Sequence, residues 1–184
     1  MAFSKKTFQI GQRRLGPLET AKSSHLAEFQ VRNQERFAPY APARSDAFYT
    51  RGYWARARRA SRYERVQEEA LRWVLMDASG VYAQINMDQI VRGAFQSAVL
   101  GYSLDKPLEG QGIMNACLRA IIDYAFSDLK LHRLMANHVL ENERSAAVLA
   151  RLGFEKEGVA RDYLKLNGVW RDHVLNSLVN DAYE

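Results

Sequence analysis

The Gly-x-Gly element Gly110-Gln111-Gly112 stands between a strand-like stretch and a strongly amphipathic helical stretch. Glycines at such a turn let the backbone adopt conformations that other residues avoid, and they let a ligand approach closely. The unpaired N–H groups at the start of the following helix, together with the helix dipole, favour an anion, most naturally a pyrophosphate. The element lacks the ending of a Walker loop and the third glycine of a dinucleotide fingerprint, so a plain tight turn is the alternative interpretation.

A second polar element begins at Asn142, one strand-like stretch later. Asn142 is a suitable N-cap for a short helix whose apolar residues recur at helical spacing. Gly153 follows at the position where a left-handed residue commonly ends a helix.

The elements that must position these residues alternate between strands and helices. We expect strands or helices at the following places, in order: a strand at Phe8–Arg14, ended by Gly16-Pro17; helix at Thr20–Phe37; a loop at Ala38–Arg44; helix at Phe48–Gln67; strands at Leu71–Met76, Val81–Ile90 and Phe95–Leu104; helix from Ile113 to Phe126; a strand at Leu131–Leu140; the helix after Asn142; and two strands, Phe154–Leu166 and Trp170–Val179, joined at Asn167-Gly168. This order predicts an α/β chain around a mixed sheet.

Five segments in this order resemble one family: Gly101-Tyr102-Ser103, Gly110-Gln-Gly-Ile-Met114, Asn142 through Ser145, Leu152-Gly-Phe-Glu-Lys-Glu-Gly158 and Trp170-Arg-Asp-His-Val174. The chain resembles the GCN5-related N-acetyltransferase (GNAT) family, and within it the ribosomal-protein N-terminal acetyltransferases of the RimJ and RimL type. The resemblance covers about Trp73 to Val179, whereas the first third matches loosely.

The resemblance implies a single GNAT domain over residues 1–184. Its mixed, mostly antiparallel central sheet would have about six to seven strands, flanked by about four helices. Two parallel central strands, Ser97–Leu104 and Leu131–Leu140, would splay into a V-shaped cleft that holds acetyl-CoA. The residues implied in cofactor binding are Ser103, Leu104, Glu109, Gly110, Gln111, Gly112, Ile113, Asn142 and Arg144. The Gln or Arg that the family usually carries three residues before the first glycine is Pro107 here.

Acetyl transfer requires an unprotonated amine, a polarised thioester carbonyl and a proton for the departing thiolate. A protein α-amino group has a pKa of about 7.7–8.0, so little base strength is required. The resemblance assigns the catalytic hydroxyl near the sulfur to Ser145, because the tyrosine of many relatives is Leu149 here; the alternative is a helix residue that only satisfies a backbone donor. The carboxylate of the RimL type aligns with Leu164, so no general base is assigned.

Composition limits the other possibilities. The chain has 184 residues, 47% of them apolar, which fits one domain with a continuous core. Cys117 is the one cysteine, and His25, His132, His138 and His173 lack metal-ligand spacing, so we expect no disulfide framework and no metal. We find no apolar run of membrane-spanning length and no secretory pattern, and therefore expect a cytoplasmic protein without a membrane partner.

Seven arginines between Arg51 and Arg72 stand among tyrosines and tryptophans, within a chain of net charge +5. Such a segment can contact RNA or the ribosome through phosphates and bases. The alternative is a solvated helix in which Glu64, Glu68 and Glu69 pair with arginines at helical spacing.

Three functions are therefore compared. The first is acetyl-CoA-dependent transfer to the N-terminal α-amino group of a protein, with a ribosomal protein as the acceptor that the resemblance implies. The second keeps the chemistry with a small amine as acceptor, such as a polyamine, an amino acid or an aminoglycoside. The third is a ribosome- or RNA-binding module that keeps the fold with little turnover.

Overall fold

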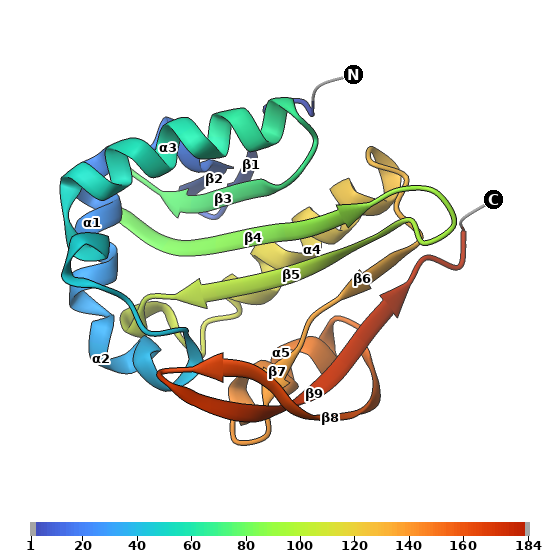
Figure 1. The fold of residues 1–184 in the computed structure, drawn as a ribbon. Helices are drawn as coiled ribbons and strands as arrows, with labels where there is room; N and C mark the ends of the chain where they lie inside the picture. The colour runs from blue at the N-terminus through green and yellow to red at the C-terminus, as the bar shows by residue number, and fades with distance from the viewer. Residues whose placement is uncertain (1–2, 183–184) are drawn as a thin grey trace.

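The computed structural model describes residues 3–182. Their strands form one continuous sheet, and helices cover both of its faces (Figure 1). The strands are β1 (Phe8–Ile10), β2 (Arg13–Pro17), β3 (Leu71–Met76), β4 (Val81–Val91), β5 (Ser97–Leu104), β6 (Arg133–Met135), β7 (His138–Val139), β8 (Glu155–Leu166) and β9 (Val169–Val179). The α-helices are α1 (Ser23–Arg32), α2 (Gln34–Phe37), α3 (Arg51–Val66), α4 (Ile113–Ser127) and α5 (Glu143–Arg151). Short 3₁₀ turns are η1 (Leu18–Thr20), η2 (Ala38–Tyr40), η3 (Asp46–Tyr49) and η4 (Lys106–Leu108).

Strands β1 to β5 form an antiparallel meander, whereas β5 and β6 are parallel. The parallel pairing extends only over Ser97–Val99 against Arg133–Met135. Beyond Val99, β5 has no strand on that edge, and the chain after β6 turns toward β9 instead. The predicted V-shaped splay between two parallel strands is therefore present.

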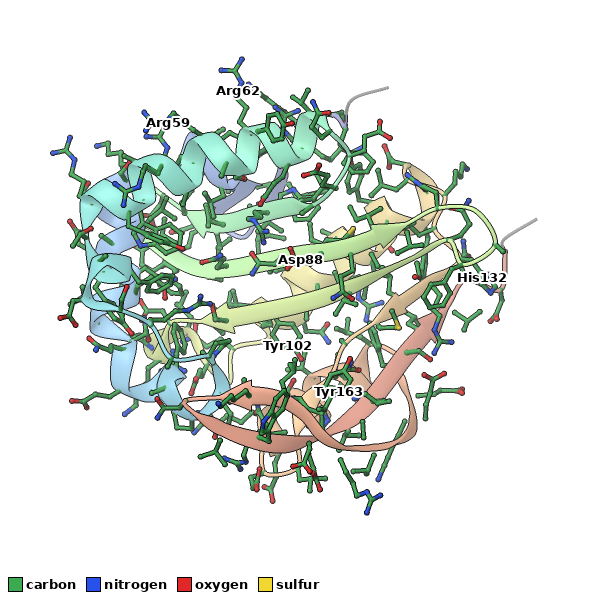
Figure 2. The ribbon with its side chains drawn as sticks, in the orientation of Figure 1. Arg59, Arg62, Asp88, Tyr102, His132 and Tyr163 are labelled. Carbon is green, nitrogen blue, oxygen red and sulfur yellow. The ribbon has the colours of Figure 1, made fainter. Side chains whose placement is uncertain are left out.

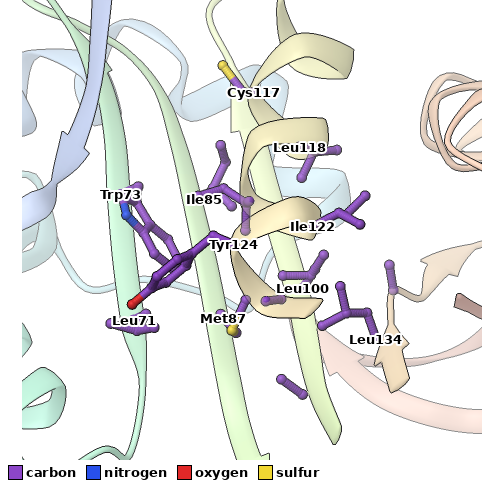
Figure 3. Close-up of a cluster of buried hydrophobic side chains, with 14 of the residues drawn as sticks. Leu71, Trp73, Ile85, Met87, Leu100, Cys117, Leu118, Ile122, Tyr124 and Leu134 are labelled. Carbon is purple, nitrogen blue, oxygen red and sulfur yellow. The ribbon is translucent and has the colours of Figure 1, made fainter. Parts of the chain in front are cut away.

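Helix α4 covers one face of the sheet because its apolar residues recur every three or four positions. Cys117, Leu118 and Ile121 are almost fully buried against strands β3 to β5, where Trp73 and Ile85 face the helix (Figure 3). Each large side chain buried in this way contributes about 1.5–3 kcal/mol of transfer free energy. This packing fixes the helix start relative to the end of β5, and therefore positions the glycine turn.

Helices α1 and α3 cover the other face, with α3 running along the sheet near β3 (Figure 1). A second core of buried residues includes Leu26, Phe29, Trp54 and Val74. Arg65 and Glu19 form an ion pair at 2.8 Å inside this layer, with both side chains about nine-tenths buried. None of the helices within residues 3–182 combines the length and apolar character needed to cross a membrane.

Two predicted strands each divide in two, which accounts for nine strands where about seven were expected. The expected strand at Phe8–Arg14 is wrong: Gly11, in the left-handed region at φ +57°, turns the chain back so that Ile10 pairs with Arg13. Pro17 is the last residue of β2 and does not break the strand before it. The expected strand Leu131–Leu140 becomes β6 and β7, because the segment leaves β5 and follows β9. Single-turn α2 is the additional helix.

Candidate active site

A cleft of about 1860 Å³ extends from the start of α4 along β5 to the β8–β9 hairpin, and is bounded on the other side by α3. The predicted residues Ser103, Glu109, Gly112, Asn142 and Ser145 all line it. The structure thus brings together residues from β5, the turn before α4, and the start of α5. These residues can share one cleft because β5 separates from β6, which leaves the edge of β5 open.

The turn before α4 uses glycine for its backbone conformation. Gly110 and Gly112 both have φ +73°, the left-handed region that favours glycine, and a Cβ at either position would meet no atom within 4 Å. The first helical hydrogen bond of α4 runs from the Ala116 amide to the Gly112 carbonyl, at 3.0 Å. The amides at the head of the helix are therefore available to an anion.

Glu109 differs from the glycines that follow it, because its amide donates to the Lys106 carbonyl at 3.1 Å. Its carboxylate accepts from Arg36 of α2 and, at 2.9 Å, from Arg144 of α5. Arg36 also donates to the Leu104 carbonyl. Glu109 and Leu104 thus anchor the turn in this structure, and the amides from Gly110 to Ile113 are the ones that an anion could reach.

Asp105 directly follows β5 and is buried. It accepts hydrogen bonds from Arg32 Nε at 2.8 Å and Asn33 Nδ2 at 3.0 Å. These contacts tie the end of β5 to α1 and leave the carboxylate in a structural role, so it is no candidate for a general base.

Tyr102 and Ser145 form the polar centre of the cleft. The phenolic oxygen of Tyr102 lies 2.7 Å from Ser145 Oγ, while the Ser145 amide donates to Asn142 Oδ1 at 3.1 Å. The N-cap prediction for Asn142 is confirmed, and the Ser145 hydroxyl contacts a side chain instead of serving only a backbone donor. Burial raises the pKa of Tyr102 to about 12, against a smaller lowering by the hydrogen bond to Ser145, so the phenol remains protonated at neutral pH.

The sequence pattern did not predict that Tyr163 contacts a residue of the cleft. Between Ala160 and Leu164 the β8–β9 register shifts, and Asp162 adopts φ +47°. Within this bulge lies Tyr163 (Figure 2), whose hydroxyl accepts a hydrogen bond from Asn137 Nδ2 at 3.1 Å, and Asn137 lines the cleft. The Tyr163 ring packs against His173, with ring centroids 5.3 Å apart. Bulges of this kind redirect side chains near sites.

A polar floor is formed by residues of β3, β4 and α3 on the side of the cleft toward α3. Arg72 donates to Glu64 at 2.8 Å and pairs with Asp88 at 2.9 Å. Burial lowers the pKa of Arg72, but hydrogen bonds and charge from Glu64 and Asp88 outweigh it and raise the pKa overall. Asp88 remains partly exposed on β4 in the middle of the sheet (Figure 2).

The remaining candidate residues lie away from Tyr102 and Ser145 or have hydrogen-bond partners of their own. Cys117 is buried in the core, which raises the pKa of its thiol to about 12. His138 and His173 line the cleft, and the Nδ1 atom of each lies 2.9 Å from a backbone carbonyl. Within residues 3–182, no group of three or more His, Cys, Asp or Glu side chains is arranged to hold a metal ion.

The fold and cleft define an acetyltransferase of the GNAT class. The family model for the acetyltransferase (GNAT) domain matches residues 15–155, and the chain belongs to this family and is an N-acetyltransferase. The chain is 38% identical over 168 residues to the probable N-acetyltransferase YjcK of Bacillus subtilis, covering 89% of this chain and 92% of that protein. It is 38% identical over 156 residues to the Escherichia coli [ribosomal protein uS5]-alanine N-acetyltransferase, covering 83% and 80%.

Two solved structures are similar along nearly the whole chain. The crystal structure of the Vibrio fischeri ribosomal-protein-S5-alanine acetyltransferase has a TM-score of 0.92 at 34% identity, covering 97% of this chain and 99% of that one. Mycobacterium smegmatis RimJ, solved in complex with CoA-disulfide, has a TM-score of 0.84 at 27% identity, covering 92% and 82%. The resemblance stated from the sequence motifs is therefore confirmed.

Proposed function

We propose that this protein uses acetyl-CoA to acetylate the N-terminal α-amino group of a protein, and that the acceptor is a ribosomal protein. The observation that carries the proposal is the open edge of β5 beyond Val99, which ends at a turn with two left-handed glycines. The named relatives support the acceptor, since the Escherichia coli and Vibrio fischeri proteins are alanine acetyltransferases of ribosomal protein S5. We propose one acetyltransferase domain over residues 1–184, working in the cytoplasm.

The turn before α4 fits the pyrophosphate of acetyl-CoA. The amides from Gly110 to Ile113 would hold its negative charge, aided by the dipole of the fifteen-residue helix that follows. Arg144 is 77% exposed in its side chain and can reach the nucleotide part while still close to Glu109. Ser103 would offer backbone groups to the pantetheine arm, and Asn142 holds the start of α5 in place through its cap.

Bound acetyl-CoA supplies a thioester carbonyl and a thiolate leaving group. Ser145 would donate a hydrogen bond to the departing sulfur, because its hydroxyl is held in the cleft by Tyr102. Tyr102 stays protonated at neutral pH, so its phenol can donate a hydrogen bond to Ser145 Oγ. The hydroxyl proton of Ser145 would then point away from Tyr102. No general base is assigned here, and the pKa of an α-amino group, about 7.7–8.0, means that little base strength is required.

The acceptor side of the cleft favours a polypeptide over a small amine. The cleft continues past Tyr102 toward the hairpin and the polar floor beneath α3, which leaves room for residues that follow an N-terminal amine. Asp88 and Glu64 are both paired with Arg72, so the floor does not present the concentrated negative charge that a polyamine would need. No separate observation favours an amino acid or an aminoglycoside.

Calorimetric titration with acetyl-CoA, with free CoA as competitor, tests the cofactor. Mass spectrometry of three acceptor types then tests the substrate: a peptide with a free N-terminal alanine, the same peptide with a blocked N-terminus and an internal lysine, and spermidine. We expect a mass increase of one acetyl group on the free N-terminus alone. Acetylation of spermidine without acetylation of the peptide would establish the small-amine alternative, and no binding of acetyl-CoA by folded protein would refute the proposal.

A further inference from the structure

Helix α3 carries six arginines and one glutamate, and the structure divides these arginines into two groups. Arg58 donates to the Glu19 carbonyl and to Ser23, and Arg65 pairs with Glu19 and donates to the Phe3 carbonyl. Arg58, Arg65 and Arg72 of β3 therefore each have partners within the fold. The other four are exposed, and their side chains make no hydrogen bond or ion pair with any residue within 3–182: Arg51, Arg56, Arg59 and Arg62.

Three of the exposed arginines form one stripe along the outside of the helix. At about 100° per residue, Arg51 and Arg62 lie about 20° apart around the axis, and Arg59 lies about 60° from Arg62. The side chains of Arg59 and Arg62 point away from the sheet (Figure 2). Arg56 lies about 60° from Arg59 on the side away from Arg62, about 120° from Arg62, and lines the cleft. We call Arg51, Arg59 and Arg62 the outer arginine stripe.

No acidic side chain offsets this stripe on its own helix. Glu64 is the one acidic residue of α3, and its carboxylate is paired with Arg72 at the sheet. Like charges three or four residues apart destabilise a helix, so Arg59 and Arg62 cost stability unless an external anion lies over them. The exposed side chain of Tyr63, 61% accessible, follows Arg59 by one helical turn and offers a flat ring beside the charges.

We propose that the outer arginine stripe binds the phosphodiester backbone of RNA. The stripe spans about 16 Å along the helix, long enough to contact several consecutive phosphates, and Tyr63 can stack on an unpaired base. An anionic membrane is disfavoured because the exposed residues of α3 include no Leu, Ile, Phe or Trp to insert among lipids. The other side of α3 forms part of the cleft wall, so RNA bound to the stripe would lie one helix diameter from the acceptor site.

The test uses the full-length protein and a short fluorescein-labelled RNA hairpin, with binding followed by anisotropy. The variant Arg51→Gln/Arg59→Gln/Arg62→Gln removes the stripe. The matched control Lys130→Gln/Lys156→Gln/Lys165→Gln removes the same charge from exposed positions elsewhere. We expect the stripe variant to bind about tenfold more weakly at about 0.1 M salt, with a shallower dependence of affinity on salt, and the control to bind much more like the wild type.

Acetylation of an RNA-free peptide provides the second readout, because the stripe lies outside the cleft and its loss should leave this rate unchanged. RNA affinity of the stripe variant equal to that of the wild type would overturn the proposal, as would wild-type protein that fails to bind RNA at low salt. Binding to vesicles of anionic phospholipid in place of RNA would overturn it in favour of a membrane. Each result is independent of whether acetyl transfer occurs, so the failure of one proposal is distinguishable from that of the other.

Discussion

The phenolic oxygen of Tyr102 lies 2.7 Å from Ser145 Oγ, although 43 residues separate the two in the chain. Tyr102 stands on β5 just past the point where its parallel neighbour departs, and Ser145 lies in the first turn of α5. The contact therefore bridges the strand and the helix on one side of the cleft. It also fixes the direction of a hydroxyl that we propose acts on the leaving sulfur.

Ser145→Ala is expected to lower kcat for peptide acetylation about 10- to 100-fold, because the departing sulfur loses its hydrogen-bond donor. The dissociation constant for acetyl-CoA should stay near the wild-type value, since the anion-binding turn is unaffected. Tyr102→Phe should lower kcat less, and the double variant should show non-additive losses. Steady-state kinetics and calorimetry test this, and equal turnover in Ser145→Ala would remove the serine from the mechanism.

Gly112→Asp is expected to weaken acetyl-CoA binding by at least about tenfold, because a carboxylate would repel the pyrophosphate. A side chain at Gly112 meets no protein atom within 4 Å, and Asp and Asn tolerate the left-handed region better than most residues. The control Gly112→Asn has the same shape without the charge and should bind more tightly than the aspartate variant. Calorimetry decides it: equal affinity in the two variants would place the pyrophosphate elsewhere.

Alkaline pH is expected to destabilise the fold through Tyr102. Its pKa is raised from 10.0 to about 12, so between pH 10 and 12 the folded state holds a proton that the unfolded chain releases. The free energy of unfolding therefore falls as pH rises through this range, by about 1–3 kcal/mol from this residue. Urea titrations at pH 8 and pH 11 measure it. Tyr102→Phe should lose less stability on this change than the wild type, and an equal loss would contradict the assignment.

Asp105→Ala is expected to lower the free energy of unfolding by about 2–3 kcal/mol, because Arg32 and Asn33 lose their buried acceptor. Asp123→Ala is the control, since Asp123 is exposed on α4. Urea unfolding of the two variants and the wild type measures the difference. A change in Asp105→Ala no larger than in the control would show that these contacts contribute little.

Tyr163→Phe is expected to lower kcat/KM for the peptide acceptor about tenfold, because Asn137 loses the hydroxyl that orients both side chains beside the cleft. Acetyl-CoA affinity should not change, since the residue lies away from the glycine turn. Tyr63→Phe on the outer side of α3 removes the same hydroxyl from an exposed site and serves as the control. Unchanged acceptor kinetics in Tyr163→Phe would exclude a role for its hydroxyl.

Local patterns in the sequence sufficed for most elements of this fold. The apolar spacing of α4, the cap at Asn142 and the Asn167-Gly168 hairpin are each specified by residues close in the chain, and all three are present. The resemblance supplied what such patterns do not contain, namely that one parallel strand pair separates. The splitting of residues 131–140 into β6 and β7 depends on pairing with β9 about forty residues later.

The unpredicted parts of the candidate site all depend on contacts between distant residues. Arg36 reaches Glu109 and Leu104 across about seventy positions, and no spacing rule connects them. Tyr163 lies in the second of two register shifts in β8, where Asp162 adopts the left-handed conformation. The arginine segment was ambiguous for the same reason: Arg58, Arg65 and Arg72 find partners outside their own helix or strand, and only the fold shows which arginines are left over.

Strand β9 has a consequence for the order of events during synthesis. It is the one sheet partner of β7 and β8 within residues 3–182, and it also holds the outer edge of β6. The meander from β1 to β5 can pair as the chain grows, because each strand meets its predecessor. The far wall of the cleft cannot form until Val169–Val179 has left the ribosome, so the cleft would be completed only after the sheet from β1 to β5 has already formed.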